Sequence, residues 1–134
     1  MEAVIRHLGN MKFEAMARGH RLISDQPVEN QGTDRGMTPP ELLLASLGTC
    51  AGYYAAQYLQ VRGLSSQRIA VRVTAEKATQ PARLSSFVID VEAPDIDPKH
   101  HDGLLRAVKA CLVHNTLSGT PNIELHVNTA VPVA

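Results

Sequence analysis

The feature that most constrains the fold is an apolar stretch at residues 42–61, LLLASLGTCAGYYAAQYLQV. It contains no acidic, basic or histidine residue, and Cys50 lies near its centre. Just before it, residues 38–41 read TPPE, which is the pattern of a capping box with prolines in the first turn. Gly63 follows as a stop signal. We therefore expect one helix that ends at about Arg62. Because it is apolar on nearly all sides, it should be enclosed by protein.

The length of this helix also allows a membrane span, but its content argues against one. It carries two glutamines, a serine, a threonine, two glycines and three tyrosines, so it is only moderately hydrophobic. We expect no contact with a membrane. One face of a sheet can cover only one side of such a helix. A second copy of the chain is the simplest cover for the other side, so we expect a homodimer with residues 42–61 at or near the interface.

Short alternating runs on either side of this helix predict strands. Gly9-Asn10 is expected to be the turn of a hairpin over residues 3–17, which would place Val4, Arg6 and Leu8 against Phe13, Ala15 and Ala17. The other predicted elements are a short strand at 20–24, paired strands at 68–76 and 87–91, a second helix from Asp97-Pro98 to about Gly119, and a closing strand at 123–129. This order predicts a single α+β domain, 1–134, with antiparallel sheet packed against a long buried central helix.

Composition excludes several function classes. The chain has 134 residues with 13 basic and 13 acidic side chains, and neither sign forms a run, so we expect no nucleic-acid partner. The N-terminal residues carry charges and lack the apolar core of a secretory signal, so we expect a cytoplasmic protein. Only two cysteines are present, Cys50 and Cys111. In a reducing compartment they are either inert buried thiols or a reactive pair.

Chemistry at Cys50 would require a thiolate. An ordinary cysteine has a pKa of about 8.5, and an apolar helix suppresses ionisation further, so a cation must be supplied. The candidates are Arg18, Arg21 and Arg35, which precede the helix. Glu41 lies on the opposite face of the helix from Cys50 and about 13 Å away along its axis. It either holds such an arginine or only completes the helix cap.

The second cysteine can reach the first if the two predicted helices pack side by side. His114 shares the face of Cys111, where it could stabilise a thiolate, move a proton, or simply complement the helix dipole. The cysteines are not paired at the short spacing of a zinc site, and no HxxxH pattern occurs, so we expect no metal site.

Three segments together resemble a known family. SDQP at 24–27, GMTPPELLLASLGTC at 36–50 and KACLVHNTL at 109–117 are similar to the OsmC/Ohr family of thiol-dependent hydroperoxide reductases, and more to its OsmC-related branch. The resemblance implies an intertwined homodimer without cofactor that acts on organic hydroperoxides. Cys50 matches the peroxide-attacking cysteine and Cys111 the resolving one. A sulfenic acid on Cys50 would condense with Cys111 to a disulfide, which a dithiol reductant then reduces.

The resemblance also assigns an electrostatic pair, for which Arg18 is the preferred arginine and Glu41 the carboxylate. Two positions depart from the family pattern. The family glutamate usually stands where this chain has Pro40, and a proline often follows the second cysteine, where this chain has Leu112. The alternative function is a non-catalytic module that binds a small ligand and keeps both thiols inert. The retained cysteines favour the enzyme, and the displaced glutamate favours the binding module.

Overall fold

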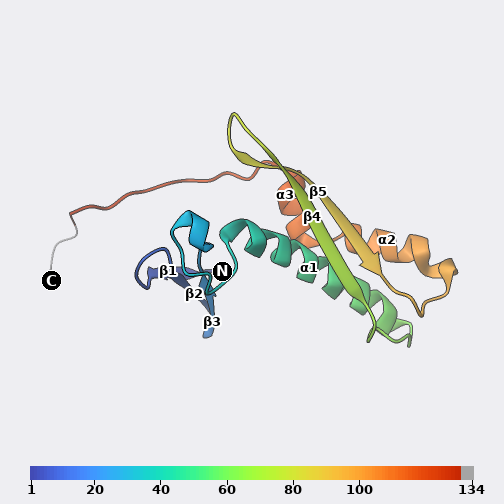
Figure 1. Ribbon diagram of the computed structural model, residues 1–134. Coiled ribbons are helices and arrows are strands. Elements are labelled where there is room, and N and C mark those ends of the chain that lie inside the picture. The colour runs from blue at the N-terminus through green and yellow to red at the C-terminus, as the bar shows by residue number, and fades with distance from the viewer. Residues whose placement is uncertain (131–134) are drawn as a thin grey trace.

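The computed structural model describes residues 1–130 and has the α+β class expected from the sequence (Figure 1). Its strands are β1 (Val4–His7), β2 (Phe13–Ala17), β3 (His20–Ser24), β4 (Ala70–Ala78) and β5 (Arg83–Glu92), and its helices are α1 (Pro39–Val61), α2 (His101–Lys109) and α3 (Leu112–Ser118). Short 3-10 turns, η1 (Val28–Asn30) and η2 (Pro98–His100), precede α1 and α2.

The antiparallel strands form two separate sheets. One has the order β1-β2-β3, and the other is the β4–β5 hairpin. The hairpin lies along α1, whereas the three-stranded sheet stands apart beside the start of α1 (Figure 1). Only one of the two sheets therefore covers the central helix within one chain.

The register of the first hairpin differs from the expected one. Leu8 donates its N–H to the carbonyl of Lys12 at 2.9 Å, so the turn includes Met11 as well as Gly9 and Asn10. This extra residue moves the pairing by one position, and Ile5 pairs with Ala15. A shift by one residue exchanges the two faces of a strand. The face that carries no Asp, Glu, Lys or Arg, called the apolar face below, has Ile5, Phe13, Ala15, Ala17 and Leu22 together with His7 and His20, while Val4 and Arg6 lie on the other face.

The core lies between one face of α1, the β4–β5 hairpin and α2. Leu47, Ala51, Ala55 and Leu59 are the buried residues of α1. On the side toward β4, a Cβ added at Gly48 would lie 3.1 Å from Val73, which shows how closely helix and strand approach. Other faces of α1 remain open, so the helix is buried along one face only within a single chain.

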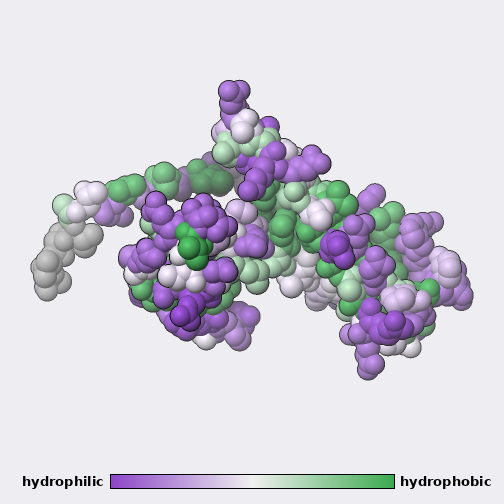
Figure 2. Space-filling model, viewed as in Figure 1, coloured by the Kyte–Doolittle hydropathy of each residue, from purple (hydrophilic) through white to green (hydrophobic). Residues whose placement is uncertain are grey.

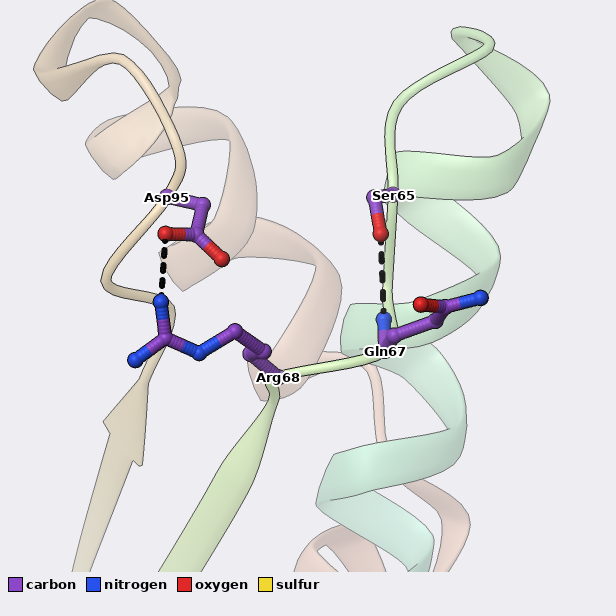
Figure 3. A network of polar contacts seen from close by, with 4 residues as sticks. All are labelled: Ser65, Gln67, Arg68 and Asp95. Carbon is purple, nitrogen blue, oxygen red and sulfur yellow. Dashed lines mark hydrogen bonds and ion pairs between the residues drawn. The ribbon is translucent and has the colours of Figure 1, made fainter.

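The ends of α1 and β5 farthest from the three-stranded sheet are joined by polar contacts (Figure 3). Arg68, just before β4, pairs with Asp95, just after β5, at 2.8 Å. Next to it the N–H of Gln67 donates to the hydroxyl of Ser65 at 3.3 Å. The Arg68–Asp95 pair joins the segment before β4 to the segment after β5, whereas the Ser65–Gln67 bond lies within the loop between α1 and β4. Over residues 1–130, no helix combines the length and hydrophobicity needed to cross a bilayer.

The connection between β3 and α1 is built around the buried carboxylate of Asp25. It accepts hydrogen bonds from the N–H of Gln26 at 2.7 Å, the hydroxyl of Thr33 at 2.8 Å and the N–H of Arg35 at 3.0 Å. Burial acts to raise the pKa of Asp25, but these hydrogen bonds outweigh it and lower the pKa below its usual value. The loop that had no expected regular structure thus links the three-stranded sheet to α1 through a defined set of bonds.

The expected closing strand at 123–129 is wrong for the single chain. Residues 119–130 leave α3 in an extended path without strand pairing (Figure 1). Their alternating apolar side chains face solvent, and Leu125 is 86% exposed. Figure 2 shows this hydrophobic character along the segment where it leaves the body of the molecule. The segment has the pattern of a strand, but its own chain offers it no neighbouring strand.

Candidate functional site

Helix α1 carries Cys50, and a capping box fixes the N-terminus of this helix. Thr38 caps the helix, and its N–H and hydroxyl donate to the Glu41 carboxylate at 2.9 and 2.8 Å. The reciprocal bond from the N–H of Glu41 to the Thr38 hydroxyl completes the capping box. These bonds lower the pKa of Glu41. Cys50 follows near the middle of the helix, half-buried, on the side that faces α3.

Cys111 lies at a break in the second helix, which corrects the expectation that this helix continues to about Gly119. The helix is divided into α2 and α3, and Cys111 is the residue that caps α3. Its backbone is extended, with φ −58° and ψ 129°, and its sulfur accepts the N–H of His114 at 3.5 Å. The side chain is 1% exposed. The break turns the thiol of Cys111 toward α1 instead of along a helical face.

The two cysteines meet at this point, and each alters the ionisation of the other. Burial acts to raise the pKa of Cys50, but hydrogen bonds from the Cys111 thiol and from the N–H groups of Val113 and Leu112 outweigh it, so the pKa of Cys50 is lowered. Burial is also the main cause that raises the pKa of Cys111, followed by its hydrogen bond to Cys50. Of the two thiols, Cys50 therefore ionises the more readily and Cys111 the less readily.

The expected cation does not reach Cys50 within one chain. Arg18 is exposed at the turn between β2 and β3, with φ 51°. Arg21 pairs with Glu14, and Arg35 contributes its backbone N–H to the loop around Asp25. Among the residues described, the groups that hydrogen-bond to the Cys50 sulfur belong to Cys111 and the start of α3.

The same holds for the expected arginine–glutamate pair. Glu41 takes its hydrogen bonds from Thr38, and within residues 1–130 of a single chain it makes no ion pair with Arg18. The helix-cap interpretation of Glu41 is the one that the geometry of a single chain supports.

The backbone donors of Leu112 and Val113 are the functional groups that the sequence reasoning missed. The sequence signal that could have revealed them is Leu112, which stands where the family pattern often has proline. Proline has no N–H, so leucine at this position keeps a hydrogen-bond donor at the first residue of α3. Peptide N–H groups aimed at a sulfur favour its charged form without any side-chain cation.

Leu112→Pro tests this contribution. Proline fits the first position of a helix, and Cys111 already has the extended backbone that a residue before proline prefers. Loss of one hydrogen bond to a charged sulfur should slow the alkylation of Cys50 by iodoacetamide at neutral pH about tenfold. Leu112→Ala keeps the N–H and is the matched control, with a rate close to that of the original protein. An unchanged rate in Leu112→Pro would remove this N–H from the site.

A pocket of about 260 Å³ lies between α1, β5 and α3, and its lining includes neighbours of the two cysteines along the chain but neither cysteine itself. Leu47, one helical turn before Cys50, and His114, which bonds to Cys111 through its backbone, both line it. The rest of the lining includes Phe87 and Leu117 with the hydroxyl groups of Ser85 and Ser86. Such a mixed lining suits a small organic molecule with one polar end. Within the described part of the chain, no three His, Cys, Asp or Glu side chains gather to hold a metal ion.

Solved structures with the same fold include OsmC-like proteins. A protein of Psychrobacter arcticus 273-4, whose name refers to osmotic stress induction and a detoxification response, has a TM-score of 0.77 at 23% identity, covering 89% of this chain and 88% of that one. OsmC of Legionella pneumophila, named as an organic hydroperoxide resistance protein, has a TM-score of 0.67 at 15% identity, covering 89% and 90%. An OsmC like protein of Mycoplasma pneumoniae gives 0.68 at 20%, covering 88% and 85%.

These structural similarities show that the chain has the fold of OsmC-like proteins. No curated protein matches the chain. The family described as OsmC-like protein matches residues 32–126, which is more than half of the sequence and includes both cysteines. The chain therefore belongs to the OsmC-like protein family.

Proposed function

We propose that this chain is a cysteine-based peroxidase that reduces organic hydroperoxides, with Cys50 as the nucleophile and Cys111 as the resolving cysteine. The observation that carries the proposal is the meeting of the two thiols, of which Cys50 has a lowered pKa and the buried Cys111 a raised one. Nucleophilic sulfur chemistry needs this division of roles. The name of the Legionella relative points to the same class of substrate.

The proposed reaction has three steps. The Cys50 thiolate attacks a peroxide oxygen, an alcohol leaves, and Cys50 becomes a sulfenic acid. The sulfenic acid condenses with the Cys111 thiol, which forms a disulfide and releases water. A dithiol reductant then restores both thiols by exchange. A reducing cytoplasm would supply such a reductant. The pocket beside Leu47 and Phe87 offers the organic group of the peroxide an apolar surface.

A homodimer is part of the proposal, and the surface area of the single chain supports it. The chain exposes 10442 Å². A compact folded protein of 14.5 kDa is expected to expose about 6,900 Å². The excess of about 3,500 Å² per chain includes the extended C-terminal segment, and over two copies it amounts to about 7,000 Å², which is at the upper end of the total area that obligate dimers bury.

Three uncovered apolar surfaces would meet in that dimer. The first is the face of the β1–β3 sheet that carries Phe13 and Leu22. The second is a groove of about 550 Å³ along α1 and β4, lined by Ala45, Gly48, Gly52, Ala56, Val71 and Val73 among others. The third is the alternating segment at 119–130, which has the pattern of an edge strand. Packing the sheet of one copy on the groove of the other would enclose α1, as its sequence requires.

The proposed dimer would also place Arg18 of one copy near the cysteines of the other. The turn that carries Arg18 belongs to the sheet that would pack against α1 of the second copy. In that position its guanidinium can add to the backbone donors already on Cys50, and Glu41 at the exposed start of α1 can orient it. We propose this pair as the electrostatic partner of the thiolate.

The test is peroxide consumption with a dithiol present. The reduced protein should consume cumene hydroperoxide over many turnovers with dithiothreitol as the reductant, and more slowly with hydrogen peroxide, which cannot use the apolar pocket. The capping role of Glu41 favours the rival function, a non-catalytic binding module. Absence of consumption, together with both thiols still free, would establish that rival.

A further inference from the structure

Helix α2 makes an unusually close contact with α1 at Tyr58, two helical turns beyond Cys50. Gly103 of α2 is buried, and a Cβ added to it would lie 2.2 Å from the hydroxyl oxygen of Tyr58. An ordinary contact to a Cβ is 3.4–4 Å long. Glycine is therefore the residue that allows α2 to lie this close to the tyrosine ring.

The ring of Tyr58 is itself held in place by two further side chains. Its hydroxyl oxygen lies 3.1 Å from Nδ1 of His100, which immediately precedes α2, and the two rings meet edge to face. The guanidinium of Arg62 lies over the Tyr58 ring, 3.6 Å from its centroid, and donates to the Tyr58 carbonyl at 3.0 Å. We call Tyr58, His100 and Gly103 the latch between α1 and α2.

The latch and the cysteine pair lie at matching positions along the two helices. Tyr58 follows Cys50 by eight residues, and Gly103 precedes Cys111 by eight residues. Tyr58 meets Gly103 while Cys50 hydrogen-bonds to Cys111, so α1 and α2 run antiparallel and both contacts belong to one register. Eight residues of an α-helix span about 12 Å, so the latch can act on the thiols only through the helices.

The contacts between these two points are apolar and do not fix the register in the same way. Ala51 and Ala55 of α1 form one buried cluster with Val108 of α2. Hydrophobic contact is non-directional, and each alanine offers a neighbouring helix only a single methyl group. A disulfide, in contrast, forms only when the two Cα atoms lie about 4.4–6.8 Å apart. The thiols therefore require a register that the alanine contacts alone do not set.

We propose that Tyr58 and Gly103 are positioning residues, which set the register of α2 on α1 and thereby hold Cys111 where it can bond to Cys50. This inference rests on the proposed function, because it concerns the resolving role of Cys111. The two residues act on the disulfide-forming step, since Cys111 directly follows the end of α2 and moves with that helix.

The experiment measures how strongly the two thiols favour their disulfide, without any peroxide. The reduced protein is equilibrated with mixtures of glutathione and glutathione disulfide, and the linked fraction of Cys50 and Cys111 is determined by acid quenching, alkylation and mass spectrometry. One glutathione disulfide is reduced to two glutathione molecules, which take up the two protons, while the two cysteine thiols are oxidised to the disulfide. The equilibrium constant is the effective concentration of one thiol at the other.

We expect Gly103→Ala to lower this effective concentration about a hundredfold, a loss that a displacement of about 1 Å at a reacting pair can cause. The added methyl group must move either α2 or the ring by about that distance. Tyr58→Leu removes the three ring atoms that the methyl group would meet. Gly103→Ala should therefore cost little in the Tyr58→Leu background, which a general effect of alanine on the helix would not reproduce.

The matched control is Gly119→Ala. The nearest atom to its added methyl group is the carbonyl oxygen of Asn115 at 3.6 Å, an ordinary contact, so the effective concentration should not change. An equal loss from Gly103→Ala with and without Tyr58→Leu would overturn the inference, because the alanine would then act independently of the ring. An unchanged effective concentration in Gly103→Ala alone would overturn it as well.

Tyr58→Leu alone keeps the inference testable should Gly103→Ala fail to fold. It removes the contacts of the latch without adding volume at Gly103, so the effective concentration should fall about tenfold, the equivalent of one lost hydrogen bond. An unchanged value would contradict the inference. A protein whose disulfide responds to these variants but which consumes no cumene hydroperoxide would instead refute the proposed peroxidase and leave the latch supported, so the two failures are distinguishable.

Discussion

Cys50→Ser should abolish the consumption of organic hydroperoxides, whereas Cys111→Ser should retain a single turnover. Serine at position 50 removes the only sulfur that has a lowered pKa in this site, and a hydroxyl at neutral pH is not a comparable nucleophile. Serine at position 111 still leaves Cys50 able to attack the peroxide, but no thiol remains to resolve the sulfenic acid. Oxidised Cys50 should therefore accumulate in that variant.

The two variants are controls for each other, because each removes one sulfur from the same buried pair. Peroxide loss is measured first without and then with dithiothreitol, and the oxidised state of Cys50 is trapped in its absence with a dimedone-type reagent. Full turnover in Cys50→Ser would contradict the assignment of the nucleophile. Multiple turnovers in Cys111→Ser at the original rate would show that the external dithiol, and not Cys111, resolves the sulfenic acid.

Phe13→Asp should convert the dimer to a monomer and greatly reduce peroxide consumption. Phe13 is 41% exposed in the single chain, so the carboxylate costs little there. In the proposed dimer the same side chain lies against the second copy, and burying an unpaired charge costs several kcal/mol. Light scattering should then report the 14.5 kDa of one chain instead of twice that mass.

The matched control is Val88→Asp. Val88 is an apolar strand residue of similar exposure, 54%, but it lies on the outer face of β5 opposite Thr74, among polar side chains. The Val88→Asp substitution should leave both the mass and the activity of the dimer unchanged. A Phe13→Asp variant that keeps the mass of the dimer would show that the apolar face of the β1–β3 sheet is not the interface.

The elements with strong local signals could be predicted from the sequence. The capping box at 38–41 and the glycine at 63 give both ends of α1, because each depends on neighbouring residues only. The alternation of Val71 and Val73 likewise predicts β4 and the face that it turns toward α1. Cys50 is thereby placed on its helix before any tertiary contact is known.

The features that depend on distant contacts could not be predicted in this way. The break at Cys111 has no proline or glycine to signal it, since the residues around it, KACLVHNTL, continue an amphipathic pattern. The turn at Gly9 gains one residue and exchanges the faces of β1. The strand expected at 123–129 requires a neighbouring strand that its own chain does not offer. The apolar face of the β1–β3 sheet likewise has no partner within one chain and stays exposed.

The pairing of Cys50 with Cys111 is most directly tested by treating the fully reduced protein with one equivalent of cumene hydroperoxide and mapping its disulfides by peptide mass spectrometry. We expect a linked pair of peptides that contain Cys50 and Cys111 of the same chain, formed in proportion to the peroxide added. Two free thiols after the peroxide has been offered, or a Cys50 bridge between copies, would contradict it.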